Sequence, residues 1–132
     1  MFLGFYLIWF TLPGQATFVI DSLPGYTPVG EPIFIAGSFN SWNPGDTEYT
    51  LAKDEQNKWF LVMPESPEGS SIDFKFTRGD WNRVEKGING EEIPNRQFTF
   101  GNGDKVDFVI SNWADHGGGG GSTAADNVDI MD

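Results

Sequence analysis

The chain has 132 residues, a length that allows one domain. Its formal net charge of −11 argues against DNA, RNA and acidic membrane surfaces as partners. The absence of cysteine excludes disulfides, a thiol nucleophile and thiolate metal sites.

The first 16 residues, MFLGFYLIWFTLPGQA, are apolar and carry no charged side chain. They are similar to the apolar part of a secretory signal, with Ala16 as the small residue at a cleavage point. We therefore predict a leader over residues 1–16 and a secreted or periplasmic protein. A buried first strand or the remnant of a longer leader is the alternative. The segment is too short to span a membrane convincingly, and we expect no membrane partner.

Residues 17–113 contain short runs in which apolar side chains alternate with polar ones, separated by turn signals such as Pro-Gly and Asn-Gly. No stretch repeats apolar residues at helical spacing for ten residues. We predict an all-β fold, a single antiparallel immunoglobulin-like β-sandwich of about seven strands over residues 17–113. The expected strands are Thr17–Ile20, Ile33–Ala36, Glu48–Leu51, Lys58–Met63, Ile72–Thr77, Gln97–Phe100 and Lys105–Ile110.

The alternation also assigns side chains to faces. Ile72, Phe74 and Phe76 share one face of their predicted strand, and Lys75 lies on the other. By the same reasoning Trp59 belongs to the core, and we expect no binding role for it.

Residues 114–132 open with a run of five glycines and contain four Asp without a basic residue. This composition predicts a flexible linker. The last residues, Val128–Asp132, alternate apolar and acidic side chains like the beginning of a strand. We interpret the chain as the front piece of a longer protein, with a frayed tail as the alternative.

The sequence shows no convincing arrangement of the residues that common enzymes use for catalysis. The single histidine, His116, lies beside the glycine run, where it cannot be held in place to act as a general base for a nucleophile. The adjacent acids Glu91 and Glu92, in a predicted loop, fit solvated charge better than a glycosidase pair. Residues 43–48 resemble a calcium loop only weakly. We expect no enzyme, no cofactor and no metal.

Two tryptophans lie in polar turns, Trp42 in GSFNSWNPG and Trp81 in RGDWN. Each indole could fold back and cap the sandwich. The alternative is that both stand open as flat apolar plates. A sugar ring offers an apolar C–H face that an indole can cover, and a rim of hydroxyls that amide and charged side chains can bond. Because removing apolar area from water stabilises a complex, two such rings would bind a sugar chain.

Three segments, IFIAGSFNSWNPG, KWFLVMPESPEGSSIDFKFTRGDW and EEIPNRQFTF, resemble starch- and glycogen-binding domains. These are carbohydrate-binding module families 20 and 48, the latter including the glycogen-binding domain of AMP-activated protein kinase β subunits. The resemblance covers residues 17–110. It implies a β-sandwich without catalytic activity that binds α-glucan of the starch or glycogen type through two aromatic rings set at an angle.

Residue by residue, the resemblance implies that Trp42 is the first stacking ring and Trp81 the second, as the glycogen-binding type places it. Lys75, on the outward face of its strand, would bond glucose hydroxyls, and Asn95 matches a hydroxyl-bonding amide. Residues 82–90 depart from both families, because this segment is longer and more charged than a glycogen-type hairpin.

The tail is similar to the linker that precedes an esterase-type α/β-hydrolase in bacterial proteins. The resemblance therefore implies a non-catalytic module with an attached or associated hydrolase. Two alternatives stay open: a regulatory sandwich that buries the tryptophans at a protein interface, and a small glycosidase or esterase in its own right.

Overall fold

A computed structural model describes residues 14–101 and 104–116 of the chain. Of the predicted leader (residues 1–16) the structure describes residues 14–16, and of the predicted linker (residues 114–132) it describes residues 114–116. The rest of both segments lies outside the described residues. Within the two described ranges, no helix is long and apolar enough to cross a membrane.

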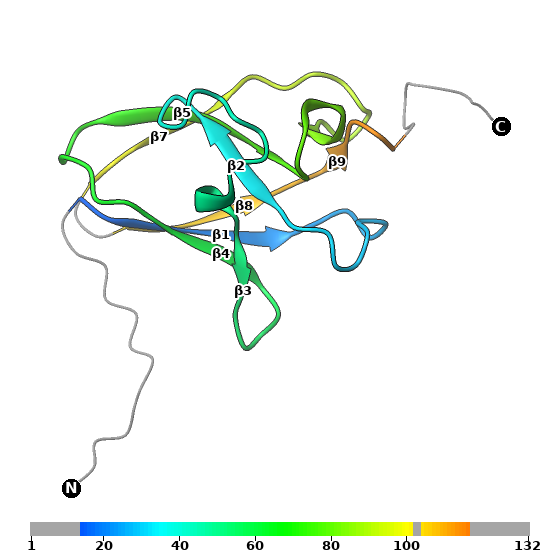
Figure 1. Ribbon diagram of the computed structural model, residues 1–132, viewed down its shortest axis with the longest axis horizontal. Helices are drawn as coiled ribbons and strands as arrows, with labels where there is room; N and C mark the ends of the chain where they lie inside the picture. Colours follow the sequence, from blue (N-terminus) through cyan, green and yellow to red (C-terminus); the bar gives the residue numbers. More distant parts are fainter. Residues whose placement is uncertain (1–13, 102–103, 117–132) are drawn as a thin grey trace, which may run out of the picture.

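The described chain is built from short strands, as predicted (Figure 1). They form two main sheets and a small ribbon, and two short 3-10 helices lie in the connections. The strands are β1 (Ala16–Ser22), β2 (Phe34–Gly37), β3 (Ala52–Lys53), β4 (Trp59–Met63), β5 (Ser71–Thr77), β6 (Glu85–Lys86), β7 (Arg96–Thr99), β8 (Asp104–Val109) and β9 (Asn112–Trp113).

The sheets have the orders β3-β4-β1-β8 and β2-β5-β7, and β6 pairs with β9. Pairing is antiparallel throughout these sheets except between β1 and β8, which run parallel. Figure 1 shows β5 and β7 lying across from β1, β4 and β8, so the all-β sandwich is confirmed. The parallel pair is a detail that hairpin signals along the sequence cannot reveal, because its strands are far apart in the chain.

Aromatic side chains fill the space between the two sheets. Phe18 of β1 lies 5.1 Å from Phe74 of β5, between ring centroids, and 5.1 Å from Phe98 of β7. The predicted inward face of β5 is confirmed, since Phe74 and Phe76 are fully buried and Ile72 packs against the same cluster. Trp59 also packs against this core, as expected.

The strand predicted at Glu48–Leu51 is wrong. Thr47–Tyr49 form a 3-10 helix instead, and the Asp46 carboxylate accepts a hydrogen bond from the backbone amide of Glu48. This cap gives the backbone a local alternative to a sheet, which alternation of side chains does not reveal. The three strands that the sequence did not predict, β3, β6 and β9, are two residues long, too short to show an alternation.

Candidate functional site

Trp42 lies in the loop that follows β2, and its backbone has an unusual conformation. Ser41 and Trp42 both have a φ of 57°, in the left-handed region that side chains other than glycine rarely adopt. The Asn40 side chain holds the turn, because its oxygen accepts from the Gly37 amide at 2.9 Å and its nitrogen donates to the Ile35 carbonyl at 3.0 Å. Backbone strain of this kind persists only where surrounding contacts impose it, often at binding sites.

Trp81 begins the 3-10 helix Trp81–Arg83, shortly after β5 ends. Gly79 makes the turn with a φ of 117°, which a residue with a side chain would adopt only under strain. The Arg83 guanidinium donates to the Asp80 carboxylate at 3.0 Å, and this bond holds the pKa of Asp80 below its usual value. Trp81 itself is 44% exposed, although it is one of the largest apolar side chains.

The two predicted rings lie beside each other. The centroids of Trp42 and Trp81 are 6.5 Å apart, and the ring planes are tilted by 40°. The two loops also approach closely through their backbones, since a Cβ added at Gly45 would lie 2.9 Å from the Gly79 carbonyl oxygen. The half-buried Trp42 and the exposed Trp81 thus form one aromatic surface, which we call the indole pair.

Lys75 lies on the predicted face of β5, but it is not open to solvent. The residue is only 9% exposed, and its ammonium nitrogen lies 3.8 Å from a carboxylate oxygen of Glu92. Lys86 donates a hydrogen bond to the same carboxylate. The pKa of Glu92 is lowered, mainly by the Lys86 hydrogen bond and then by both ammonium charges. The expectation of an outward Lys75 is corrected in this respect, because the segment carrying Glu92 reaches across it.

Asn95 is exposed and lies just before β7. The pairing of β5 with β7 ends where Phe74 lies opposite Arg96, and Lys75 and Asn95 are the next residues beyond that pair. On the other side of β5, Lys75 pairs with Ala36 of β2, the strand that leads into the Trp42 loop. Because β2 and β5 are antiparallel, the Trp42 loop leaves the ladder at Gly37, beside Phe74, and the Trp81 loop leaves it at Thr77, beside Phe34. Lys75 therefore lies between the two points from which these loops begin.

A buried ion pair fixes the segment that carries Asn95. Glu85 has no exposed surface, and its carboxylate accepts from the Arg96 guanidinium at 2.7 Å and from the Phe76 backbone amide at 3.0 Å. Arg96 also donates to the Val109 carbonyl at 2.7 Å. This pair ties both ends of the 86–95 segment to the sandwich. Sequence reasoning missed Glu85, because an acid in a charged segment is ordinarily solvated.

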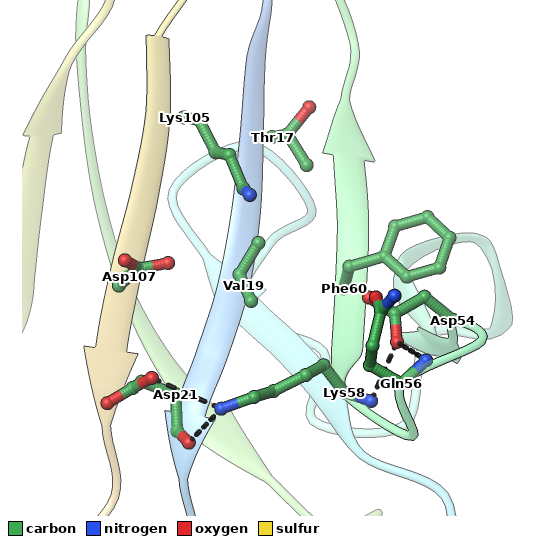
Figure 2. Close-up of a pocket in the computed structure, with 9 residues that line it drawn as sticks. All are labelled: Thr17, Val19, Asp21, Asp54, Gln56, Lys58, Phe60, Lys105 and Asp107. Carbon is green, nitrogen blue, oxygen red and sulfur yellow. Dashed lines mark hydrogen bonds and ion pairs between the residues drawn. The ribbon is translucent and has the colours of Figure 1, made fainter. Parts of the chain in front are cut away.

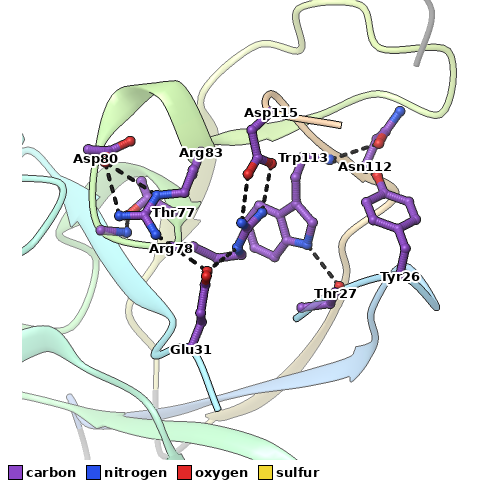
Figure 3. Close-up of polar contacts among 11 residues, drawn as sticks. Tyr26, Thr27, Glu31, Thr77, Arg78, Asp80, Arg83, Asn112, Trp113 and Asp115 are labelled. Atoms are coloured by element: carbon purple, nitrogen blue, oxygen red, sulfur yellow. Dashed lines mark hydrogen bonds and ion pairs between the residues drawn. The ribbon is translucent and has the colours of Figure 1, made fainter. Parts of the chain in front are cut away.

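A second polar cluster, shown in Figure 3, includes Arg83, the last residue of the 3-10 helix that Trp81 begins. Arg78 is 3% exposed, and it donates two hydrogen bonds of 2.8 Å to Asp115 and one of 2.9 Å to Glu31. The two bonds from Arg78 are the main cause that lowers the pKa of Asp115. Arg83 lies 3.4 Å from the same Glu31 carboxylate, so the 3-10 helix of Trp81 is joined to this cluster.

His116, Tyr26 and Tyr49 make structural contacts. His116 stacks on Tyr26 with ring centroids 3.5 Å apart, and the Tyr26 hydroxyl accepts from the Trp113 amide. Tyr49 packs against Phe39. Among residues 14–101 and 104–116, no group of three or more His, Asp or Glu side chains is arranged to hold a metal ion.

An open groove of about 490 Å³ lies on the outer face of the β3-β4-β1-β8 sheet, away from the indole pair's strands (Figure 2). Its lining is largely charged, and Lys58 bonds the carboxylate and carbonyl oxygens of Asp21 within it. Of the described residues that line it, Phe60 is the one aromatic. None of the predicted site residues lies in this groove.

Comparison with known proteins identifies similar segments in three enzymes. The chain is 37% identical over 95 residues to an α-amylase of Niallia circulans, covering 71% of this chain and 7% of the enzyme. It is 35% identical over 102 residues to an amylopullulanase of Thermoanaerobacter thermohydrosulfuricus, covering 76% of this chain and 7% of the enzyme. It is 31% identical over 93 residues to an amylopullulanase of Thermoanaerobacterium thermosulfurigenes, covering 68% of this chain and 5% of the enzyme.

The chain thus spans 5% to 7% of the length of these curated relatives. No family model matches the sequence. The similarity is to a small region of each enzyme.

Proposed function

We propose that this chain is a non-catalytic carbohydrate-binding module that binds α-glucan of the starch or glycogen type on the indole pair. The observation that carries the proposal is the pairing of Trp42 with Trp81 at 6.5 Å and 40°. Two plates tilted toward each other suit a curved sugar chain, because successive rings of such a chain also turn relative to one another. A flat chain would lie well on one plate and poorly on the other.

Polar groups near the strand ends would bond the hydroxyl rim of the sugar. Lys75 and Glu92 form an ion pair in the free protein, and Asn95 directly precedes Arg96, the β7 residue that pairs with Phe74, the neighbour of Lys75. An ammonium group donates hydrogen bonds, a carboxylate accepts them and an amide does both. Together they can match sugar hydroxyls, which also donate and accept.

The expected affinity is moderate. Covering apolar surface is worth about 25 cal/mol per Å², so two indoles supply a few kcal/mol, part of which offsets the entropy lost on association. Polar contacts to exposed groups add little, because water competes for them. We expect a Kd of about 10–100 μM for a short α-glucan.

The enzyme relatives support this function, because an α-amylase and two amylopullulanases carry the similar segment within much longer chains. In such a setting a binding module raises the local concentration of substrate for an attached domain. We propose the same role here, beside a secreted or periplasmic hydrolase. Hydrolysis of glucan or of a nitrophenyl ester by the purified chain would contradict the non-catalytic assignment.

The test is a titration of tryptophan fluorescence with β-cyclodextrin and maltoheptaose, with cellohexaose for comparison. We expect emission to shift with the two α-glucans alone. Trp42→Ala and Trp81→Ala should each weaken binding at least about tenfold. Trp59→Phe is the matched control, because Trp59 packs against the core under Lys53, away from the indole pair.

If α-glucans change neither the emission nor the thermal stability, the proposal is wrong. The alternative of a protein-interaction sandwich would then gain, because the exposed Trp81 would need another partner.

A further inference from the structure

The side chain of Thr77, the last residue of β5, is fully buried between the two tryptophan loops. Its hydroxyl donates to the Pro44 carbonyl at 2.5 Å and accepts from the Gly79 amide at 3.1 Å. Pro44 comes two residues after Trp42, and Gly79 comes two residues before Trp81. One hydroxyl therefore bonds both loops that carry the indole pair.

The strand holds this hydroxyl in place from both sides. Thr77 pairs with Phe34 of β2 and forms an isolated bridge with Val84. A threonine hydroxyl offers one donor and two acceptor positions, and here one donor and one acceptor position are used. Thr77 is labelled in Figure 3 next to Asp80 and Arg83, at the base of the Trp81 loop.

We infer that Thr77 is a positioning residue that sets the distance and angle between the two indoles. The inference rests on the proposed function and adds a residue that does not itself touch the sugar. Stacking on two rings at once requires both to be held near their bound arrangement, and loosely supported sites lose affinity. Without the hydroxyl, the Pro44 carbonyl and the Gly79 amide would each lose a partner, and the loops would move to find others.

The test compares Thr77→Val, which keeps the shape and removes the hydroxyl, with Thr77→Ser, which keeps the hydroxyl. The first readout needs no ligand. Indoles at this separation couple electronically and give a circular dichroism couplet whose size depends on their distance and angle. Differences between the unsubstituted chain and its Trp42→Phe and Trp81→Phe variants assign the couplet to the indole pair.

We expect the couplet to shrink or change sign in Thr77→Val and to persist in Thr77→Ser. Affinity for β-cyclodextrin should fall about tenfold in the valine variant and stay within about twofold in the serine variant. A couplet and an affinity that Thr77→Val leaves unchanged would overturn the inference. If the valine variant does not fold, Thr77→Ala replaces it under the same criteria.

The outcomes separate this inference from the proposed function. If the couplet changes as expected while the unsubstituted chain binds no cyclodextrin, Thr77 positions the rings and the sugar proposal fails. If cyclodextrin binds and the couplet is the same with and without the Thr77 hydroxyl, the sugar proposal stands and the role inferred for Thr77 is wrong. A missing couplet in the unsubstituted chain contradicts the indole pair on which both depend.

Discussion

At the scale of single residues, the conformation of Ser41 makes a sharp prediction. Its φ of 57° lies in the left-handed region, where a β-branched side chain is strained. We expect Ser41→Val to lower the free energy of unfolding by about 1–2 kcal/mol, whereas Ser41→Gly should cost nothing. Urea denaturation of the three proteins measures the difference. Equal stability of the valine and glycine variants would show that the turn is not strained.

The buried ion pair of Glu85 and Arg96 makes a second prediction at this scale. Removing one charge from a buried pair leaves the other uncompensated, so Glu85→Gln should lower the free energy of unfolding by about 3 kcal/mol. The matched control is Asp21→Asn. Its ion pair with Lys58 has both side chains exposed and should contribute less than about 1 kcal/mol. Similar losses of stability in the two variants would contradict the prediction that burial makes the ion pair of Glu85 more stabilising than a surface pair.

At the scale of elements, most of the fold could be predicted and part of the site could not. Alternating apolar residues located β1, β2, β4, β5, β7 and β8, because each has a face packed on the core. Two tryptophans in polar turns were also visible, and the structure brings them together. The roles of Thr77 and Glu85 could not be predicted from the sequence. Thr77 bonds Pro44, which is distant in sequence, and Glu85 is buried although acidic side chains are usually exposed.

The contact between the two loops gives a prediction for a pair of glycines. A Cβ at Gly45 would lie 2.9 Å from the Gly79 carbonyl oxygen, and backbone atoms cannot move aside cheaply. We expect Gly45→Ala to separate the loops, to weaken β-cyclodextrin binding about fivefold and to lower the free energy of unfolding by about 1 kcal/mol. Calorimetric titration and thermal unfolding measure both. Gly25→Ala is the control, because a Cβ there meets nothing within 4 Å. Unchanged affinity in Gly45→Ala would mean that loop spacing does not control the site.

At the scale of the whole molecule, the end of the described chain is fastened to the sandwich beside the Trp81 loop. Asp115 holds the buried Arg78, and the Ala114 amide donates to the Val84 carbonyl at 2.8 Å. The Arg78 amide in turn donates to the Arg83 carbonyl at 3.0 Å, within the turn that carries Trp81. The residues just before the glycine run thus belong structurally to the candidate site's support.

This fastening predicts how acid affects stability. Arg78 lowers the pKa of Asp115 in the folded state below its ordinary value of 3.8, so the folded protein binds fewer protons there than the unfolded chain does. The stabilisation is fully present above about pH 5 and is lost as the pH falls through the folded-state pKa. Asp115→Asn should therefore lower the free energy of unfolding at pH 7, by only about 1 kcal/mol because the Asp115 side chain is 40% exposed to screening solvent and Glu31 still holds Arg78. The two proteins should converge as the pH falls below about 4.

Urea denaturation at a series of pH values measures this convergence. Asp107→Asn is the control, since it removes the same charge from an exposed position on the outer sheet face. That variant reports the general effect of reducing a net charge of −11, which should relieve repulsion and stabilise the protein slightly. A gap between Asp115→Asn and the unsubstituted chain that stays constant down to pH 3 would mean that the carboxylate acts through its shape rather than its charge. The bond to Arg78 would then not be the ion pair that secures the end of the sandwich.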